Sequence, residues 1–201
     1  MECSFALVGK GYVLVAADTT AARSIVKMKS DEDKTKVLSP HLVMTYSGEP
    51  GDTVQFAEYI ERNIRLQHMR NNHELRPQSS AAWIRRTLAD SLRSRHPYSV
   101  NLLLGGYDEA TSTPHLYWID YLGTIASVPY AAHGYGSYFA LSTLDRYHNP
   151  AASLEEGLRT LRRCIDEVAN RMAIGVGKFK VRVVDKDGAR EVELPPSVSV
   201  A

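Results

Sequence analysis

Histidine, cysteine and glycine are the residues of this sequence whose types and spacing could do chemistry. A metal site needs ligands at a close and characteristic spacing, as in His-Glu-x-x-His, and the histidines show no such spacing. They stand at positions His41, His68, His73, His96, His115, His133 and His148. We therefore expect no metal cofactor, and we interpret His133 as a packed structural residue.

The motif Gly134-Tyr135-Gly136 could suggest a loop that binds phosphate. Neither a Lys-Ser/Thr pair nor a full Gly-x-Gly-x-x-Gly pattern follows it, so the sequence does not predict a nucleotide site. The two cysteines, Cys3 and Cys164, are too few for a disulfide framework. Nothing in the sequence rules out their pairing, but reduced thiols are the simpler interpretation.

Composition and charge indicate a folded, single-domain protein. The chain has 201 residues, of which 44% are hydrophobic and 23% charged, values typical of one folded domain. We expect a single domain over residues 1–201, with a tail from about residue 195 to 201 that binds a partner or stays mobile. A net charge of +1 predicts neither nucleic acid nor a membrane surface as the main partner.

Two further patterns bear on location and surface chemistry. The first residues lack the basic and apolar regions of a secretory signal, and no apolar run is long enough to span a bilayer. We therefore expect a soluble, intracellular protein. The densest basic run is interpreted as a solvated helix face rather than a nucleic-acid footprint. It consists of Arg85, Arg86, Arg93 and Arg95.

The first half of the chain predicts three strands and two helices. The strands are residues 4–8, 12–16 and 42–46, and the helices run from 52 to about 73 and from about 79 to 95. The first two strands form a hairpin around Gly9-Lys10-Gly11. Asp52 and Gln55 resemble a capping pair at the start of the first helix. His96-Pro97 is expected to end the second helix, because the residue before proline avoids the α region.

The second half predicts further strands around another helix pair. The strands are residues 100–106, 116–120, 179–183 and 189–194, and the helices begin near residue 136 and at residue 153. Ser153 and Glu156 form a capping box, and apolar residues from Leu154 to Met172 follow at a helical spacing. This order of elements disfavours a parallel doubly wound sheet. It predicts an α+β fold, a four-layer αββα sandwich of two antiparallel sheets flanked by helix pairs.

Local motifs then point to a family. They are Gly11–Asp18, Ser47–Asp52, Leu102–Asp108, Pro114–Asp120 and His133–Ser137. In this order and at these distances, they resemble the proteasome subunit family, which has the N-terminal-nucleophile hydrolase fold, over residues 4 to about 194. The stretches 51–60, 97–104 and 131–136 are similar to the beta type-2 branch, which occupies the fourth position of the beta ring.

The resemblance implies particular site residues. In the family, an N-terminal threonine attacks a peptide carbonyl, and its own α-amino group takes the proton. Asp18 matches the family's aspartate, Lys34 or alternatively Lys36 its lysine, and Gly48 the glycine that holds the oxyanion. A structural interpretation stands beside this one. In it, Asp18 is a buried strand-end residue and Lys34 is its ion-pair partner or a surface residue.

The same resemblance predicts that the nucleophile is missing. Its position falls at about Glu2, no threonine occurs before Thr19, and we expect no propeptide and an uncut Met1. Where the family has a serine within the motif Gly134-Tyr135-Gly136, this sequence has Tyr135. The Asp and Ser-Gly-Gly cluster expected after the fourth helix is replaced by residues 174–178. Asp18, Lys34 and Gly48 are therefore expected to be vestigial matches in a chain without catalytic residues.

We expect a non-catalytic structural beta subunit of the 20S proteasome, serving ATP- and ubiquitin-dependent protein degradation in cytoplasm and nucleus. The implied partners are beta subunits at the third and fifth ring positions, the opposite beta ring across the mid-plane, and alpha-ring subunits. No cofactor, nucleic acid or membrane is implied. One alternative is an active N-terminal-nucleophile hydrolase that uses Cys3 or Ser4 after trimming. Another is a free-standing binding domain, which would be a stable monomer.

Overall fold

The first two strands of the chain form a hairpin inside a five-stranded antiparallel sheet. The computed structural model describes residues 2–23, 26–172 and 177–197. β1 (Cys3–Gly9) and β2 (Tyr12–Asp18) meet at a tight turn in which Gly11 has a φ of 79°. The sheet has the order β10-β1-β2-β11-β12. Its other members are β10 (Tyr130–Gly134), β11 (Phe179–Asp185) and β12 (Gly188–Glu191).

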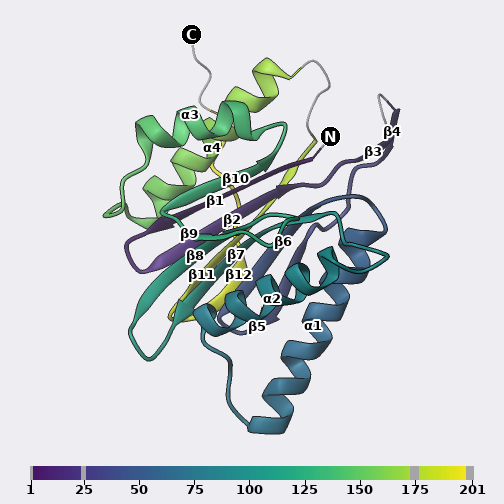
Figure 1. The fold of residues 1–201 in the computed structure, drawn as a ribbon. Coiled ribbons are helices and arrows are strands. Elements are labelled where there is room, and N and C mark those ends of the chain that lie inside the picture. Colours follow the sequence, from purple (N-terminus) through teal and green to yellow (C-terminus); the bar gives the residue numbers. More distant parts are fainter. Residues whose placement is uncertain (1, 24–25, 173–176, 198–201) are drawn as a thin grey trace.

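A second five-stranded antiparallel sheet follows the strict chain order β5-β6-β7-β8-β9. Its strands are β5 (Thr35–Ser39), β6 (Leu42–Gly48), β7 (Val100–Asp108), β8 (Thr113–Ile119) and β9 (Ile125–Ser127). A small ribbon of β3 (Ala21–Arg23) and β4 (Val26–Lys29) projects from one end of the molecule (Figure 1).

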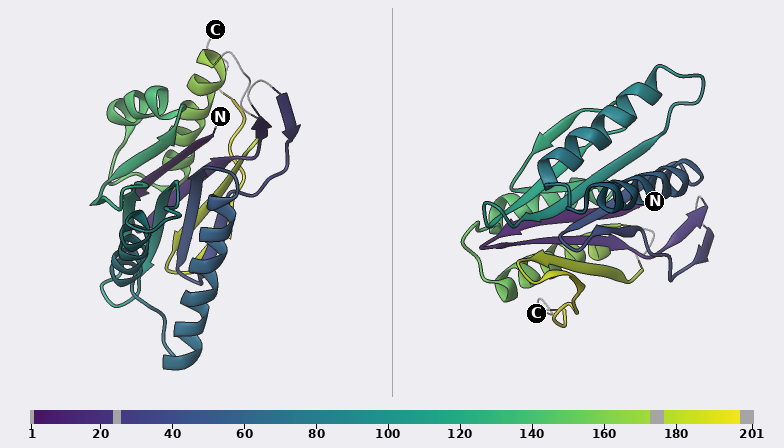
Figure 2. Two further views of the ribbon diagram at one scale, coloured as in Figure 1. Left: turned by 45° about the vertical axis from the view of Figure 1, so that its right-hand side comes forward. Right: turned by 90° about the horizontal axis from the view of Figure 1, so that it is seen from below.

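A helix pair covers the outer face of each sheet (Figure 2). The helices are α1 (Asp52–Asn71), α2 (Pro77–Leu92), α3 (Ser137–Tyr147) and α4 (Leu154–Arg171). α1 and α2 pack on the second sheet, and α3 and α4 pack on the first. The predicted capping box begins α4: the Ser153 side chain accepts from the Glu156 amide, and the Glu156 carboxylate accepts from the Ser153 amide. The four-layer αββα architecture predicted from the sequence is confirmed.

Alternating side chains of the hairpin serve two cores. Leu14 and Ala16 of β2 face the α3 and α4 side, while Val13 and Val15 pack between the two sheets. β2 is buried over its whole length, which explains why it appears in the sequence as a continuous apolar run. This inter-sheet core joins the two sheets, and the polar site described below lies at one end of it.

Some predicted details of the helices are wrong. The Asp52–Gln55 capping pair does not form. The N-cap of α1 is Gly51, which has no side chain to accept a cap hydrogen bond. The Asp52 carboxylate instead accepts from the Ser99 amide, at 3.1 Å. α2 begins at Pro77 rather than Ser79, because proline fits the first helical position, where no amide partner is needed. It also ends earlier, at Leu92.

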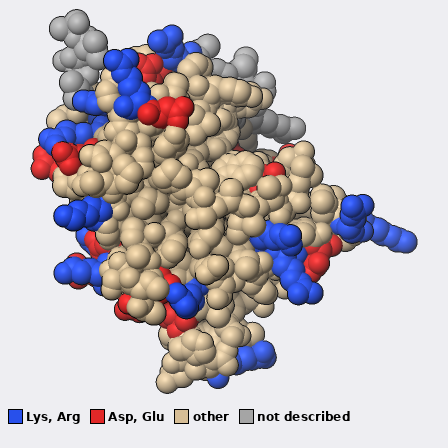
Figure 3. Space-filling view, turned by 60° about the vertical axis from the view of Figure 1, so that its left-hand side comes forward, with Lys and Arg blue, Asp and Glu red and all other residues tan. Residues whose placement is uncertain are grey.

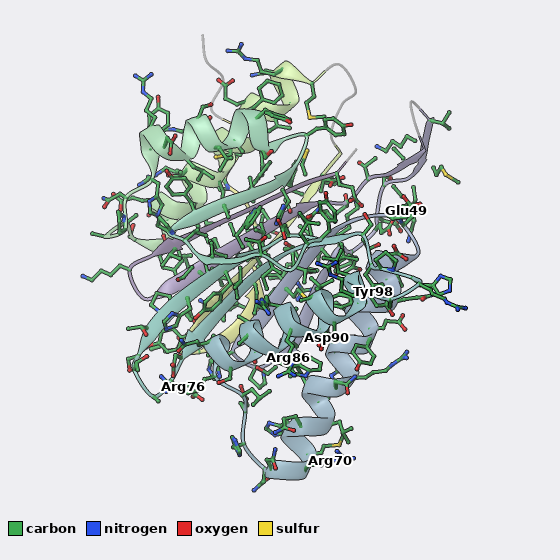
Figure 4. All side chains as sticks on the ribbon, viewed as in Figure 1. Glu49, Arg70, Arg76, Arg86, Asp90 and Tyr98 are labelled. Carbon is green, nitrogen blue, oxygen red and sulfur yellow. The ribbon has the colours of Figure 1, made fainter. Side chains whose placement is uncertain are left out.

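The predicted basic residues are all exposed, but only Arg85 and Arg86 lie on α2, whereas Arg93 and Arg95 follow its end. Figure 4 shows Arg86 and Asp90 on this helix, where their side chains form an i,i+4 pair at 3.8 Å. Both cysteines are buried and unpaired. Among the helices of the described residues, none is both long and apolar enough to cross a membrane.

Candidate functional site

Asp18, the last residue of β2, is the centre of a buried polar cluster. Its side chain is 1% exposed. One carboxylate oxygen accepts from the Cys3 amide at 2.9 Å, and the other accepts from the Thr20 amide at 3.1 Å. The Lys34 ammonium lies 3.1 and 3.0 Å from the two oxygens. A buried carboxylate is tolerated only with such partners, so the cluster satisfies the charge that it buries.

Lys34 enters the cluster because of its place just before β5. Its ammonium also donates to the Thr20 carbonyl at 2.7 Å, and its own carbonyl accepts from the Tyr46 amide at 3.2 Å. Lys36, the alternative match, instead approaches Glu61 of α1 at 3.4 Å. The structure therefore brings Lys34, and not Lys36, to Asp18.

Glu2, just before β1, and Gly48, at the end of β6, complete the cluster. The Gly48 amide at the end of β6 donates to the Glu2 carboxylate at 2.6 Å, and the second carboxylate oxygen lies 3.9 Å from the Lys34 ammonium. Gly48 has a φ of 140°, and a Cβ there would lie 2.2 Å from the Ser99 carbonyl oxygen, so only glycine fits. Burial raises the pKa of the Glu2 carboxyl, and the Gly48 amide and the Lys34 charge oppose this effect only in part.

This contact of Glu2 is the part of the site that sequence reasoning missed. The family pattern placed the absent nucleophile near this position, but nothing in the sequence indicated that the glutamate side chain would reach Gly48. The two residues are 46 positions apart: Glu2 directly precedes β1 of the first sheet, and Gly48 ends β6 of the second. Their contact depends on how the sheets stack, which no local spacing encodes.

Cys3 and Ser4 are the two residues that the catalytic alternative would use as the nucleophile. The Cys3 thiol lies against α3 and the end of α4: a Cβ on Gly136 would be 2.5 Å from its sulfur, and the Met172 sulfur is 3.9 Å away. Burial raises the pKa of this thiol to about 11, so little thiolate exists at neutral pH. Ser4 is 2% exposed and pairs with Ala17 and His133 in the sheet.

The glycine motif after His133 supports the first strand instead of holding a ligand. Gly134 pairs with Cys3, and a Cβ on it would lie 1.9 Å from the Glu2 carbonyl oxygen. Its φ of 81° also favours glycine. Tyr135, at the position where the resemblance predicted serine, is 62% exposed.

His133 itself is a packed structural residue, as predicted. Its ring stacks on Trp118 with 5.1 Å between centroids, and its Nε2 lies 3.2 Å from the Leu102 carbonyl oxygen. Of the predicted replacement cluster at 174–178, residues 174–176 lie outside the described residues. Gly177, which is described, donates its amide to the Thr20 hydroxyl at 3.1 Å.

The chemistry available in the cluster follows from its groups. Two carboxylates, one ammonium and one glycine amide can hold charge and bind a carboxylate or a carbonyl oxygen. An ionised carboxylate is an acceptor only, so it cannot replace the hydroxyl and free amine that N-terminal-nucleophile chemistry requires. Over residues 2–23, 26–172 and 177–197, no group of three His, Cys, Asp or Glu side chains is arranged to hold a metal.

Comparisons with known proteins agree with this geometry. A sequence model of the family "Proteasome subunit" matches residues 2–184. A "Probable proteasome subunit beta type-4" of Neurospora crassa is 47% identical over 96% of this chain and 95% of its own length. The "Proteasome subunit beta type-4" of Saccharomyces cerevisiae is also 47% identical, over 90% and 91%. The "Proteasome subunit beta type-2-A" of Arabidopsis thaliana is 46% identical, over 98% and 96%.

The matched region contains all four helices, the whole second sheet and the first sheet except β12 and the end of β11, together with Asp18, Lys34 and Gly48. Identity close to half over nearly the full length of each relative shows more than a shared fold, because the relatives are all beta-type subunits. The chain therefore belongs to the proteasome subunit family, as a beta subunit of the 20S core particle.

Proposed function

We propose that this beta subunit is non-catalytic: it completes the beta ring and the wall of the degradation chamber, and it cleaves no peptide bond itself. The proposal rests on one observation. The position beside Asp18 and Lys34 holds the carboxylate of Glu2, bonded to the Gly48 amide. A carboxylate offers no hydroxyl to attack a carbonyl, so Asp18, Lys34 and Gly48 serve as vestigial residues that hold the strand ends together.

Two features weigh against a replacement nucleophile. The Cys3 thiol lies in the core under α3 and α4, and burial raises its pKa, which disfavours the thiolate. The Ser4 amide belongs to a strand paired on both sides, to β10 and to β2. Exposing a free amine at Ser4 would require loss of the first residue of β1.

The partners follow from membership of a closed ring. We place beta subunits of the third and fifth positions on either side, the opposite beta ring across the mid-plane, and alpha-ring subunits on the remaining face. A broad uncharged surface on one face of the molecule supports a large contact area (Figure 3). Exposed aromatic side chains at the start of α3, such as Tyr138 at 80% exposure, support it as well.

A ring subunit and a free-standing domain differ in hydrodynamic size. We expect the tagged chain to elute from size exclusion with a large particle in both cytoplasmic and nuclear extracts, as part of ATP- and ubiquitin-dependent degradation. Elution of the whole pool as a monomer would support the free-standing domain and contradict the ring assignment.

The catalytic alternative is tested in the assembled particle. Replacing Cys3→Ala and Ser4→Ala together removes the thiol and the hydroxyl that the catalytic alternative requires but leaves Glu2, Asp18 and Lys34 in place. We expect all peptide-hydrolysing activities per particle to stay unchanged. As a matched control, removing the N-terminal threonine of a catalytic neighbour should abolish one activity. Loss of any activity in the double variant, at normal particle yield, would favour the hydrolase.

A further inference from the structure

Glu2 has the geometry of a ligand held in a binding site. Its carboxylate accepts from the Gly48 amide at 2.6 Å with one oxygen, while the other faces the Lys34 ammonium at 3.9 Å. A hydrogen bond from a backbone amide and the charge of a nearby ammonium group both favour a carboxylate at this place. The side chain is still 28% exposed, so the site can be reached from solvent.

The two donors are built into the fold independently of Glu2. Lys34 is fixed by Asp18 and by the Thr20 carbonyl, and 4% of its side chain is exposed. The Gly48 amide is oriented by a backbone conformation that only glycine adopts, and the neighbouring Glu49 amide is held by the Ser99 carbonyl at 3.0 Å. The donors would therefore keep their places if the Glu2 side chain were absent.

We propose that the Gly48 amide and the Lys34 ammonium form a carboxylate-binding site that Glu2 occupies as an internal ligand. This inference deepens the proposed function and rests on it. In a subunit that cleaves no peptide bond, the Glu2 carboxylate occupies the Gly48 amide. Carbonyl oxygens and terminal carboxylates of nearby peptides then cannot bind to it. The class of external ligand that the site would accept is a small carboxylate.

The test compares three forms of the full chain: wild type, Glu2→Ala and Glu2→Gln. Alanine removes the internal ligand and opens the site. Glutamine keeps an oxygen that can accept from the Gly48 amide but removes the charge. Each form is titrated with sodium acetate at constant ionic strength, and the Gly48 amide resonance is followed by ¹H–¹⁵N NMR. Acetate is raised only as far as saturation of Glu2→Ala requires, because an internal ligand that competes for the site raises the acetate concentration that wild type needs for half-saturation.

We expect a saturable shift of the Gly48 resonance in Glu2→Ala, and a response at least about tenfold smaller in wild type and Glu2→Gln, where the site is filled. An unresponsive Gly48 amide in Glu2→Ala, or an equal response in wild type, would overturn the inference. Neither result depends on peptide cleavage, so the binding site and the non-catalytic role are tested separately.

A second measurement decides the case if Glu2→Ala does not fold. In wild type, the Gly48 amide proton should lie downfield of its position in Glu2→Gln, because a charged acceptor makes the stronger hydrogen bond. It should also move as Glu2 titrates. A Gly48 resonance that is identical in the two forms and constant with pH would show that the carboxylate is not bound there.

Discussion

Asp18 and Lys34 form a buried ion pair that holds several strand ends together. Asp18 joins the start of β1, the end of β2 and the segment before β5 through its two oxygens. The pair is buried, so the desolvation of each charge is offset only while the other is present. A structural role alone is therefore sufficient to explain the presence of both residues. Removing one partner should lower the free energy of unfolding.

Replacing Lys34→Met tests this at the residue scale. We expect a loss of about 3–5 kcal/mol in the free energy of unfolding, because the Asp18 carboxylate would stay buried without its charged partner. Urea denaturation of the full chain measures the loss. The matched control is Lys36→Met, which removes a partly exposed pair with Glu61 and should cost no more than about 1 kcal/mol. Equal losses in the two variants would contradict the account.

The sequence was informative about this pair but did not predict the contact between Glu2 and Gly48. Asp18 ends an apolar strand that follows a glycine turn, so its buried position could be predicted from local pattern. The choice between Lys34 and Lys36 could not, because it depends on the register between β5 and β6. The bond from Gly48 to Glu2 depends on the stacking of two sheets, a relation that no spacing along the chain encodes.

Elements with strong periodicity were predicted best. The hairpin β1–β2 and helix α4 appear within one or two residues of their predicted limits, since two apolar runs around a glycine turn identify the hairpin, and a capping box and helical spacing identify α4. Short or irregular strands were missed. They are β3, β4, β5, β9 and β10. The sequence 130–134, Tyr-Ala-Ala-His-Gly, has no strand-like alternation, and it is a strand because β1 offers it an open edge.

A titratable side chain, that of His133, is buried between the two sheets. His133 of β10 in the first sheet stacks on Trp118 of β8, and its Nε2 lies near the Leu102 carbonyl of β7, both in the second sheet. Burial lowers the pKa of the imidazole from 6.5 to about 4, although the backbone carbonyls of Leu102 and Ile119 and the charge of Asp120 oppose this shift. The folded state therefore keeps His133 neutral where the unfolded chain is already protonated.

This difference predicts a loss of stability in acid. Between pH 6.5 and pH 4 the unfolded chain binds a proton at this position that the folded chain does not, so the free energy of unfolding falls as the pH falls. The loss from this group is on the order of 3 kcal/mol and is complete below its folded pKa. Urea unfolding from pH 7 to pH 4 measures it, with His133→Gln as the control.

The glutamine variant should start from a lower stability, because it loses the stacking on Trp118. It should then show a shallower decline between pH 6.5 and pH 4. Parallel curves for wild type and His133→Gln would mean that another group is responsible for the acid sensitivity, and the inter-sheet histidine would be irrelevant to it.

At the scale of the whole molecule, the order of elements was enough to predict the layers but not the order of strands. Runs of strands alternating with helix pairs indicated two antiparallel sheets with helices outside them. That β11, near the end of the chain, pairs with β2, near its beginning, could not be predicted. β2 is a continuous apolar run and β11 alternates apolar with basic residues, and neither pattern specifies which strand is its partner.

The account as a whole depends on the absence of a hydroxyl nucleophile at the position of Glu2. The most direct test treats the native particle with a peptide electrophile that reacts with N-terminal threonines and then measures the intact mass of each subunit. We predict that this chain keeps its unmodified mass, while catalytic subunits of the same particle gain the mass of the reagent and serve as the internal control. A covalent adduct on this chain, or a mature mass beginning at Cys3 or Ser4, would contradict the account.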